Sequence, residues 1–189
     1  MKTRHWLAIG ALVSVATTAG AQTVYIGGAG GATHSNADCT GTSSCDNSDT
    51  GWKVYAGYNV NPTFGVEAVG YDMGTIRATV PFSVFGPINA SLKTTGFALA
   101  GVINVPLGTS VDLMGRLGVA SNKLQADVIG VNVVGSGSEN STGPLWGIGL
   151  AFRISPNVAI RTEIDGTSAT FGGERFETTL LSLGLSFKF

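Results

Sequence analysis

Alternation of apolar with small or polar residues, in segments of about ten residues, constrains the fold of this chain more than any other feature. The final segment shows it most clearly, with its large apolar residues at every second position: Leu181, Leu183, Leu185, Phe187 and Phe189. Successive side chains of a β-strand point to opposite faces, so this pattern predicts a strand with one apolar face. Comparable segments lie near 24–33, 52–60, 63–74, 96–105, 111–119, 146–154 and 158–165.

The connections between these eight segments alternate in length. Three are tight and rich in Asn, Pro, Gly and Ser, near 61–62, 106–109 and 155–157. The other four are longer and mostly polar, near 36–49, 75–91, 122–143 and 171–176. This order predicts an up-and-down antiparallel sheet with short turns at one end and long loops at the other. In the third segment, a bulge beyond Val69 would be needed to place Tyr71 on the apolar side.

The composition of the chain indicates whether the apolar face contacts lipid or the interior of a soluble protein. Charged residues make up only 12% of the chain, against about a quarter in ordinary soluble domains, and the mean hydropathy is +0.27. After residue 21, the sequence contains no apolar run long enough for a membrane helix. A closed sheet satisfies every backbone polar group in lipid while needing apolar residues only at alternate positions. The sequence therefore predicts an all-β, eight-stranded antiparallel up-and-down transmembrane β-barrel.

A soluble, lipocalin-like barrel would show the same alternation with the apolar face turned inward. The positions of the charges favour the membrane interpretation. The charged residues that share the parity of the apolar face stand where a segment meets a long connection, at the expected lipid headgroup level: Asp72, Lys93, Lys123 and Glu177. A soluble barrel would instead need a densely charged outer face.

The first 21 residues have the organisation of a secretory signal peptide. Lys2 and Arg4 precede an apolar run from Trp6 to Ala16, and Ala19-Gly20-Ala21 offers a small-x-small cleavage site. A membrane-anchoring helix is the alternative, but about eleven apolar residues are too few to span a bilayer. We expect cleavage before Gln22, which would leave residues 22–189 as one outer-membrane barrel domain.

The charge balance gives no support to a nucleic-acid partner, and we expect none. Loss of Lys2 and Arg4 would leave 9 basic against 12 acidic residues, a net charge of -3, with no basic run that could neutralise phosphates. The stretch Gly27 to Gly31 lacks the G-x-G-x-x-G spacing of a phosphate-binding loop. We expect no cofactor, no catalytic residue and no metal site, and we expect a monomer.

Several short motifs resemble the OmpA-type transmembrane barrel. They are Val60-Asn61-Pro62, Gly65-Val66-Glu67, Gly70-Tyr71-Asp72, Gly115-Arg116-Leu117-Gly118, Ile154-Ser155-Pro156 and the segment Ser182 to Phe189. Their order and spacing across eight segments make the resemblance fairly specific. Small opacity-type outer-membrane barrels are close relatives and remain an open alternative.

The resemblance implies a lumen closed by ionic pairs. At matching positions the network would consist of Glu67, Arg116, Arg161 and Glu163, all of inward parity. Ala29 and Ala151 stand where the family places inward Lys and Glu, so we expect a thinner plug. The chain stops at Phe189, so we expect no peptidoglycan-binding domain and do not transfer cell-wall anchoring.

The resemblance also implies partners. The C-terminal residues Leu183, Leu185, Phe187 and Phe189 resemble the signal that the barrel-assembly machinery recognises by strand pairing. Outer-membrane lipids and lipopolysaccharide are the other expected partners.

Two cysteines and one histidine are the remaining candidates for chemistry. Cys39 and Cys45 lie in the first long connection of an exported chain, so a disulfide is expected. Metal binding by these cysteines with His34 and Asp38 lacks a recognisable ligand spacing. His34 is next to Ser35, but adjacent strand residues point to opposite faces, which argues against a nucleophile-base pair.

Three functions are therefore compared. The leading hypothesis is a non-enzymatic barrel of the outer membrane that contributes to envelope integrity and to surface interactions through its long loops. A narrow channel for small solutes or ions is the alternative, favoured by the small inward residues. A lipid-modifying enzyme that uses His34 is the third.

Overall fold

The computed structural model describes residues 23–36, 42–80, 88–130, 133–171 and 173–189. The predicted signal peptide lies outside them. Nine strands form within these ranges: β1 (Thr23–Ser35), β2 (Ser44–Asp46), β3 (Ser48–Asn59), β4 (Phe64–Val80), β5 (Ile88–Pro106), β6 (Val111–Gly130), β7 (Val133–Ser155), β8 (Val158–Phe171) and β9 (Glu174–Lys188). In these ranges no helix has the length and apolar character needed to cross a membrane.

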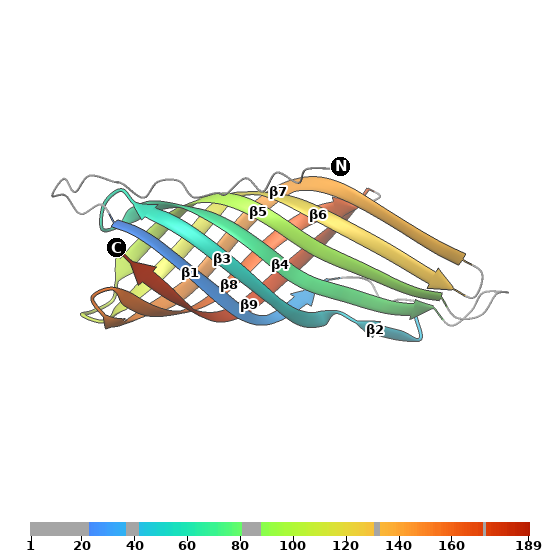
Figure 1. Ribbon diagram of the computed structural model, residues 1–189, viewed down its shortest axis with the longest axis horizontal. Helices are drawn as coiled ribbons and strands as arrows, with labels where there is room; N and C mark the ends of the chain where they lie inside the picture. The colour runs from blue at the N-terminus through green and yellow to red at the C-terminus, as the bar shows by residue number, and fades with distance from the viewer. Residues whose placement is uncertain (1–22, 37–41, 81–87, 131–132, 172) are drawn as a thin grey trace, which may run out of the picture.

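Eight of the strands close into a barrel, which Figure 1 shows from the side. Each of them pairs antiparallel with its neighbours in the order β1, β3, β4, β5, β6, β7, β8, β9, and β9 returns to pair with β1. The short strand β2 lies outside this circuit and pairs with β4. Closure leaves the barrel wall without an unpaired edge, as lipid requires. The predicted fold class is confirmed.

The two ends of the barrel differ. Tight turns join β3 to β4, β5 to β6 and β7 to β8 at the end where β1 begins and β9 finishes, which in such barrels is the periplasmic end (Figure 1). At the other end β4, β5, β6 and β7 continue far beyond the rest of the wall. The described residues of the expected loops at 75–91 and 122–143 therefore belong to the sheet, because the hydrogen-bonded register continues to Val80↔Ile88 and to Gly130↔Val133.

The outward face of the wall is an apolar belt. Its large side chains are between 44% and 74% exposed: Trp52, Val54, Phe64, Val66, Phe97, Leu99, Leu117, Val119, Trp146, Ile148, Leu181 and Leu183. A soluble protein rarely exposes so large a contiguous apolar surface to water. The belt is the lipid-contacting surface, in agreement with the predicted parity of the strands.

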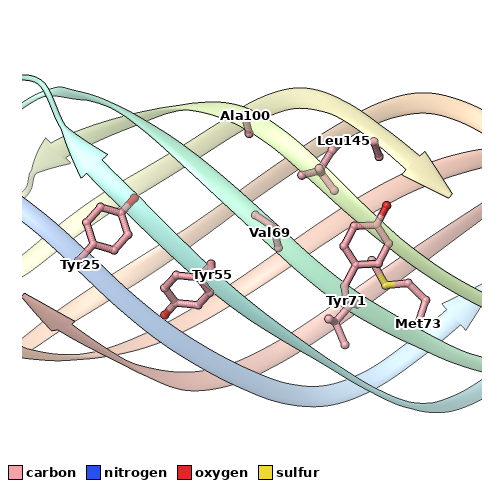
Figure 2. Packing of buried hydrophobic residues seen from close by; sticks show 10 residues of the cluster. Tyr25, Tyr55, Val69, Tyr71, Met73, Ala100 and Leu145 are labelled. Carbon is pink, nitrogen blue, oxygen red and sulfur yellow. The ribbon is translucent and has the colours of Figure 1, made fainter. Parts of the chain in front are cut away.

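The inward face combines tyrosines with glycines. Tyr25 is the register partner of Gly57, Tyr55 of Gly27, and Tyr71 of Gly96. In each pair a Cβ on the glycine would collide with the tyrosine ring, so the missing side chain makes room for the ring. Figure 2 shows two of these rings, Tyr25 and Tyr55, in one half of the lumen and Tyr71 in the other. A narrow barrel can hold such large inward residues only beside small ones.

Tyr71 also settles the register of β4. The pairing of β4 with β5 is regular from Phe64 to Asp72, so Tyr71 points into the lumen and is only 4% exposed. The irregularity comes later, between Asp72 and Thr75, where Gly74 has a positive φ of 78°. A bulge between Val69 and Tyr71 would have turned Tyr71 toward the lipid. That alternative was wrong, because the irregularity comes only after Asp72.

Candidate functional site

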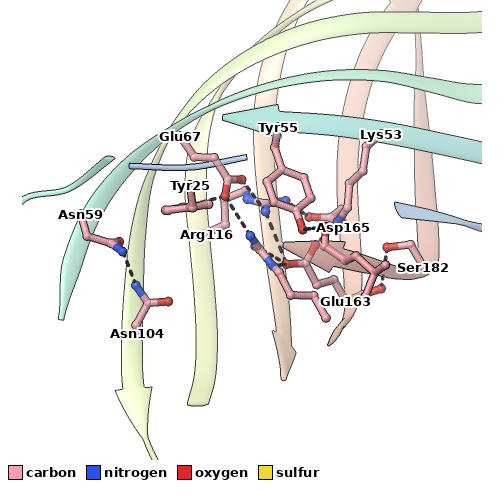
Figure 3. A network of polar contacts seen from close by, with 12 residues as sticks. Tyr25, Lys53, Tyr55, Asn59, Glu67, Asn104, Arg116, Glu163, Asp165 and Ser182 are labelled. Carbon is pink, nitrogen blue, oxygen red and sulfur yellow. Dashed lines mark hydrogen bonds and ion pairs between the residues drawn. The ribbon is translucent and has the colours of Figure 1, made fainter. Parts of the chain in front are cut away.

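Six charged side chains meet inside the lumen, and Figure 3 labels five of them: Lys53, Glu67, Arg116, Glu163 and Asp165. They come from four strands: Lys53 on β3, Glu67 on β4, Arg116 on β6, and Arg161, Glu163 and Asp165 on β8. The three residues of β8 occupy alternate positions, which places them on the same inward face. All six are at most 5% exposed. We refer to them as the ionic cluster.

Each member of the ionic cluster has a partner of opposite charge. Glu67 binds two cations, since its Oε1 lies 2.5 Å from Arg116 Nη2 and its Oε2 lies 3.3 Å from Arg161 Nη1. Arg116 Nη1 lies 2.5 Å from Asp165 Oδ1. Arg161 Nε donates to Glu163 Oε1 over 2.6 Å. Lys53 contacts Glu163 and Asp165, which connects β3 to the same group.

Tyrosine rings cover the ionic cluster. The guanidinium carbon of Arg161 lies 4.2 Å from the centroid of the Tyr55 ring, within the range of a cation-π contact. Tyr25 donates its hydroxyl hydrogen to Glu67 Oε2 over 2.8 Å. The glycines opposite Tyr25 and Tyr55 therefore make room for rings that also contact the buried charges of Glu67 and Arg161.

The charges of the ionic cluster cancel. Three cations face three carboxylates, so the group as a whole carries no net charge. Isolated buried ions are strongly unfavourable, and mutual pairing with several hydrogen bonds offsets the loss of hydration. The cluster is thus a neutral plug that depends on every one of its members.

A second layer closes the lumen on the extracellular side of the ionic cluster. Met73, Leu145 and Leu180 pack there with Tyr71. Tyr71 donates its hydroxyl hydrogen to Asn122 Oδ1 over 2.6 Å, and Asn122 Nδ2 donates to Ser168 O over 3.1 Å. Leu145, Leu180 and Asn122 are at most 2% exposed. This layer fills the lumen next to the ionic cluster, and the same apolar cluster also contains Tyr25 and Tyr55.

A cavity of about 390 Å³ lies on the other side of the ionic cluster. Residues of the tight turns line it, and its lining also includes Tyr25, Met114, Ala151 and Arg161. The cavity therefore reaches from the periplasmic end of the barrel to the plug. Asp112 and Arg153, which also line the cavity, form an ion pair with Oδ2 and Nη1 2.8 Å apart.

Comparison with known proteins identifies the family of the chain. A family model described as "Outer membrane protein beta-barrel domain" matches residues 6–189. The chain belongs to this family. Outer membrane protein A of Shigella flexneri is 33% identical over 144 residues, and that of Klebsiella pneumoniae is 32% identical over 154 residues. The matches cover 72% and 76% of this chain but only 39% and 42% of those relatives, so the chain spans about two fifths of their length.

A solved structure supports the same fold. Ail, the attachment invasion locus protein of Yersinia pestis, superposes with a TM-score of 0.54 over 90% of this chain and 99% of its own, at 21% identity. The resemblance to OmpA-type barrels that the sequence motifs predicted is confirmed. The chain is an outer-membrane β-barrel protein.

The structure brings together the four network residues expected from this family: Glu67, Arg116, Arg161 and Glu163. It adds Lys53 and Asp165, whose inward parity was visible in the sequence although their partners were not. Lys53 is the register partner of Ala29, so a cation on the neighbouring strand occupies the space beside that alanine. A plug thinner than that of the family stays a prediction. Ala151, the other position, lines the periplasmic cavity.

The C-terminal strand of this outer-membrane barrel has the expected orientation. Leu183, Leu185, Phe187 and Phe189 are 63%, 43%, 44% and 72% exposed on the outward face. Phe189 N donates to Val24 O over 2.9 Å, which extends the pairing of β9 with β1 to the last residue. Recognition by the assembly machinery stays a prediction.

Cys45 and His34 lie near the extracellular rim. Cys39 is outside the described residues, so its disulfide with Cys45 of β2 stays a prediction. Ser35 is buried and its Oγ lies 2.9 Å from Thr178 Oγ1, whereas His34 is exposed on the opposite face. His34 Nδ1 instead lies 3.3 Å from Ser48 Oγ, a neighbour that only the register of β1 with β3 reveals.

The described part of the chain shows neither a complete triad nor a metal site. No carboxylate there binds His34, so the third member of a nucleophilic triad is missing from these residues. No group of three or more His, Cys, Asp or Glu side chains is arranged there to hold a metal ion.

Proposed function

We propose that this outer-membrane protein is a non-enzymatic barrel with a closed lumen that contributes to envelope integrity and carries an extracellular sheet for surface interactions. The observation that carries the proposal is the double closure of the lumen. The ionic cluster and the layer around Tyr71 both occupy its cross-section, each from several strands. A barrel of eight strands is just wide enough for its side chains to fill it, which argues against a general diffusion pore.

The parts of β4 to β7 that extend beyond the apolar belt, which we call the extracellular sheet, support the surface role. Strands β4 to β7 continue beyond the apolar belt, and the part of β7 from Val134 to Asn140 is exposed throughout. This stretch pairs with β6, while the pairing of β7 with β8 begins only at Leu145. The sheet therefore presents both faces and one edge outside the membrane.

A shortened barrel tests the proposal. Residues 76–92 and 126–137 would each be replaced by an Asn-Gly turn, which joins the register partners Thr75 with Lys93 and Gln125 with Ser138. In cells that lack the protein, we expect this variant to restore resistance to detergent as well as the full chain does. Adhesion to protein-coated surfaces should return only with the full chain. Equal adhesion by both chains would contradict the role of the sheet.

A narrow channel is the second candidate, and the periplasmic cavity is the observation that favours it. The cavity reaches Arg161, so a rearrangement of the ionic cluster would extend the cavity further into the lumen. The layer around Tyr71 would still have to open. Conductance measurements separate the two candidates.

A further inference from the structure

A shallow groove of about 360 Å³ lies on the outward face of the wall, where the apolar belt meets the extracellular sheet. Trp52 and Val54 form one side of the groove, and Lys123 and Asn140 form the other. Gly70 and Ser121 lie between them. The groove therefore has an apolar side and a cationic side at the level of the lipid headgroups.

The register of the strands explains the shape of the groove. Trp52, Asp72, Thr95, Lys123 and Asn140 are successive partners in one row across β3 to β7. The next row toward the middle of the belt contains Val54, Gly70, Phe97 and Ser121. A Cβ added to Gly70 would meet only Val54 Cγ2, at 3.8 Å, so the floor is open to the outside. Small residues between large ones create the depression.

The charges around the groove leave one cation available. Lys93 is one diagonal step from Lys123 on the same face, because Lys93 pairs with Gln125 and Thr95 pairs with Lys123. Asp72 Oδ2 lies 2.8 Å from Lys93 Nζ and compensates that lysine. No described residue forms an ion pair with Lys123. Asp127 lies further from the belt along β6.

We propose that this groove binds a phosphorylated glycolipid of the outer leaflet, with Lys123 at the phosphate and the first part of an acyl chain over Gly70. An ammonium group at the membrane surface attracts anionic headgroups. Asn140 offers amide hydrogens to the sugar or the phosphate. Trp52 belongs to the amphipathic residues that favour the headgroup level. The proposal goes beyond the envelope role and does not depend on whether the lumen conducts.

The groove fits a lipid better than a free anion. Its lining extends from Lys123 across Thr95 and Gly70 to Val54. Phe97, which is 53% exposed in the belt, is the register partner of Gly70 and borders the groove. A soluble phosphate would use the lysine alone, with nothing for the apolar side to contact. A lipid uses both, since its chain lies along the belt while its headgroup stays at the rim.

Native mass spectrometry of the folded mature chain in detergent tests the proposal. The probes are doubly phosphorylated lipid A and the same lipid after removal of its phosphates. We expect the wild type to retain the phosphorylated form in preference, and Lys123→Gln to weaken retention roughly fivefold, whereas Lys123→Arg keeps it. Gly70→Leu fills the groove floor from outside and should weaken retention without a change in charge.

Arg175→Gln is the matched control, because Arg175 is an exposed cation, with its side chain 62% exposed, on the distant strand β9. It should retain lipid A as the wild type does. Heat-modifiable migration in gels confirms that every variant is folded. The proposal is overturned if Lys123→Gln behaves like Arg175→Gln, if dephosphorylation makes no difference, or if inorganic phosphate at equal concentration displaces the lipid.

Discussion

Arg116 of β6 and Glu67 of β4 face each other across the lumen, with Nη2 and Oε1 2.5 Å apart although β5 separates their strands in the sheet. Contacts of this kind connect wall segments that share no backbone hydrogen bonds. Removal of one partner leaves a buried charge uncompensated, which can cost about 3 to 5 kcal/mol, whereas apolar replacement of both is often tolerated.

We therefore expect strong coupling between Glu67→Met and Arg116→Met in the free energy of unfolding. The double variant should be less destabilised than the sum of the single variants, as measured by urea titration with tryptophan fluorescence in detergent. Glu67 with Arg161, at 3.3 Å, should couple in the same direction but less strongly.

The pair Asp112 and Arg153 is the control for both double-mutant cycles, that of Glu67 with Arg116 and that of Glu67 with Arg161. Its distance of 2.8 Å is similar, but its arginine side chain is 37% exposed at the periplasmic rim. Exposed ion pairs contribute roughly 0 to 1 kcal/mol, so little coupling is expected there. Additive effects in the Glu67 cycles would show that the ionic cluster does not act as a unit.

Gly96→Ala should destabilise the barrel. The added Cβ would lie 2.5 Å from Tyr71 Cζ, and overpacking of this kind costs about 1 to 3 kcal/mol. Gly137→Ala is the control, because nothing lies within 4 Å of a Cβ at that position. Equal stability of the two variants in urea titration would mean that Tyr71 moves freely and does not form a rigid layer.

The sequence predicted the barrel but not the full contents of its lumen. Alternation assigns each residue to a face, and this was enough to place Arg161 and Glu163 inward. The alternation does not show which inward residues lie at the same height along the barrel axis, because the tilt and the register of the strands determine that height. Lys53 contacts Glu163 and Asp165 because β3 and β8 place these side chains at the same height inside the barrel. Likewise, polar composition suggested a loop at 122–143, but residues 122–130 and 133–143 form a regular ladder of hydrogen bonds.

Deletion of Phe189 should slow insertion in cells more than it lowers stability. The residue contributes one exposed ring and one terminal hydrogen bond to β1, so most of the ladder between β9 and its neighbours remains. Pulse-chase labelling with heat-modifiable migration measures insertion, and urea titration in detergent measures stability. Lys188→Ala, one residue away, is the control for a general effect of changes at the terminus. Insertion at the wild-type rate would limit Phe189 to an interfacial anchor.

We expect Cys39 and Cys45 to form a disulfide that contributes little to the barrel. Cys45 lies on β2, outside the closed wall, so reduction of the disulfide should cost under about 3 kcal/mol. Mass spectrometry of unreduced peptides from membrane-extracted protein checks the bond. Two free thiols would disprove it.

Single-channel conductance in planar lipid bilayers tests the closed lumen most directly. The purified wild-type chain should produce no steady current above that of the lipid alone, because the ionic cluster and the layer around Tyr71 both block the lumen. Arg161→Ala together with Tyr71→Ala, which opens both layers, should raise the current if the chain remains folded. A steady, reproducible open level from the wild type would contradict the account.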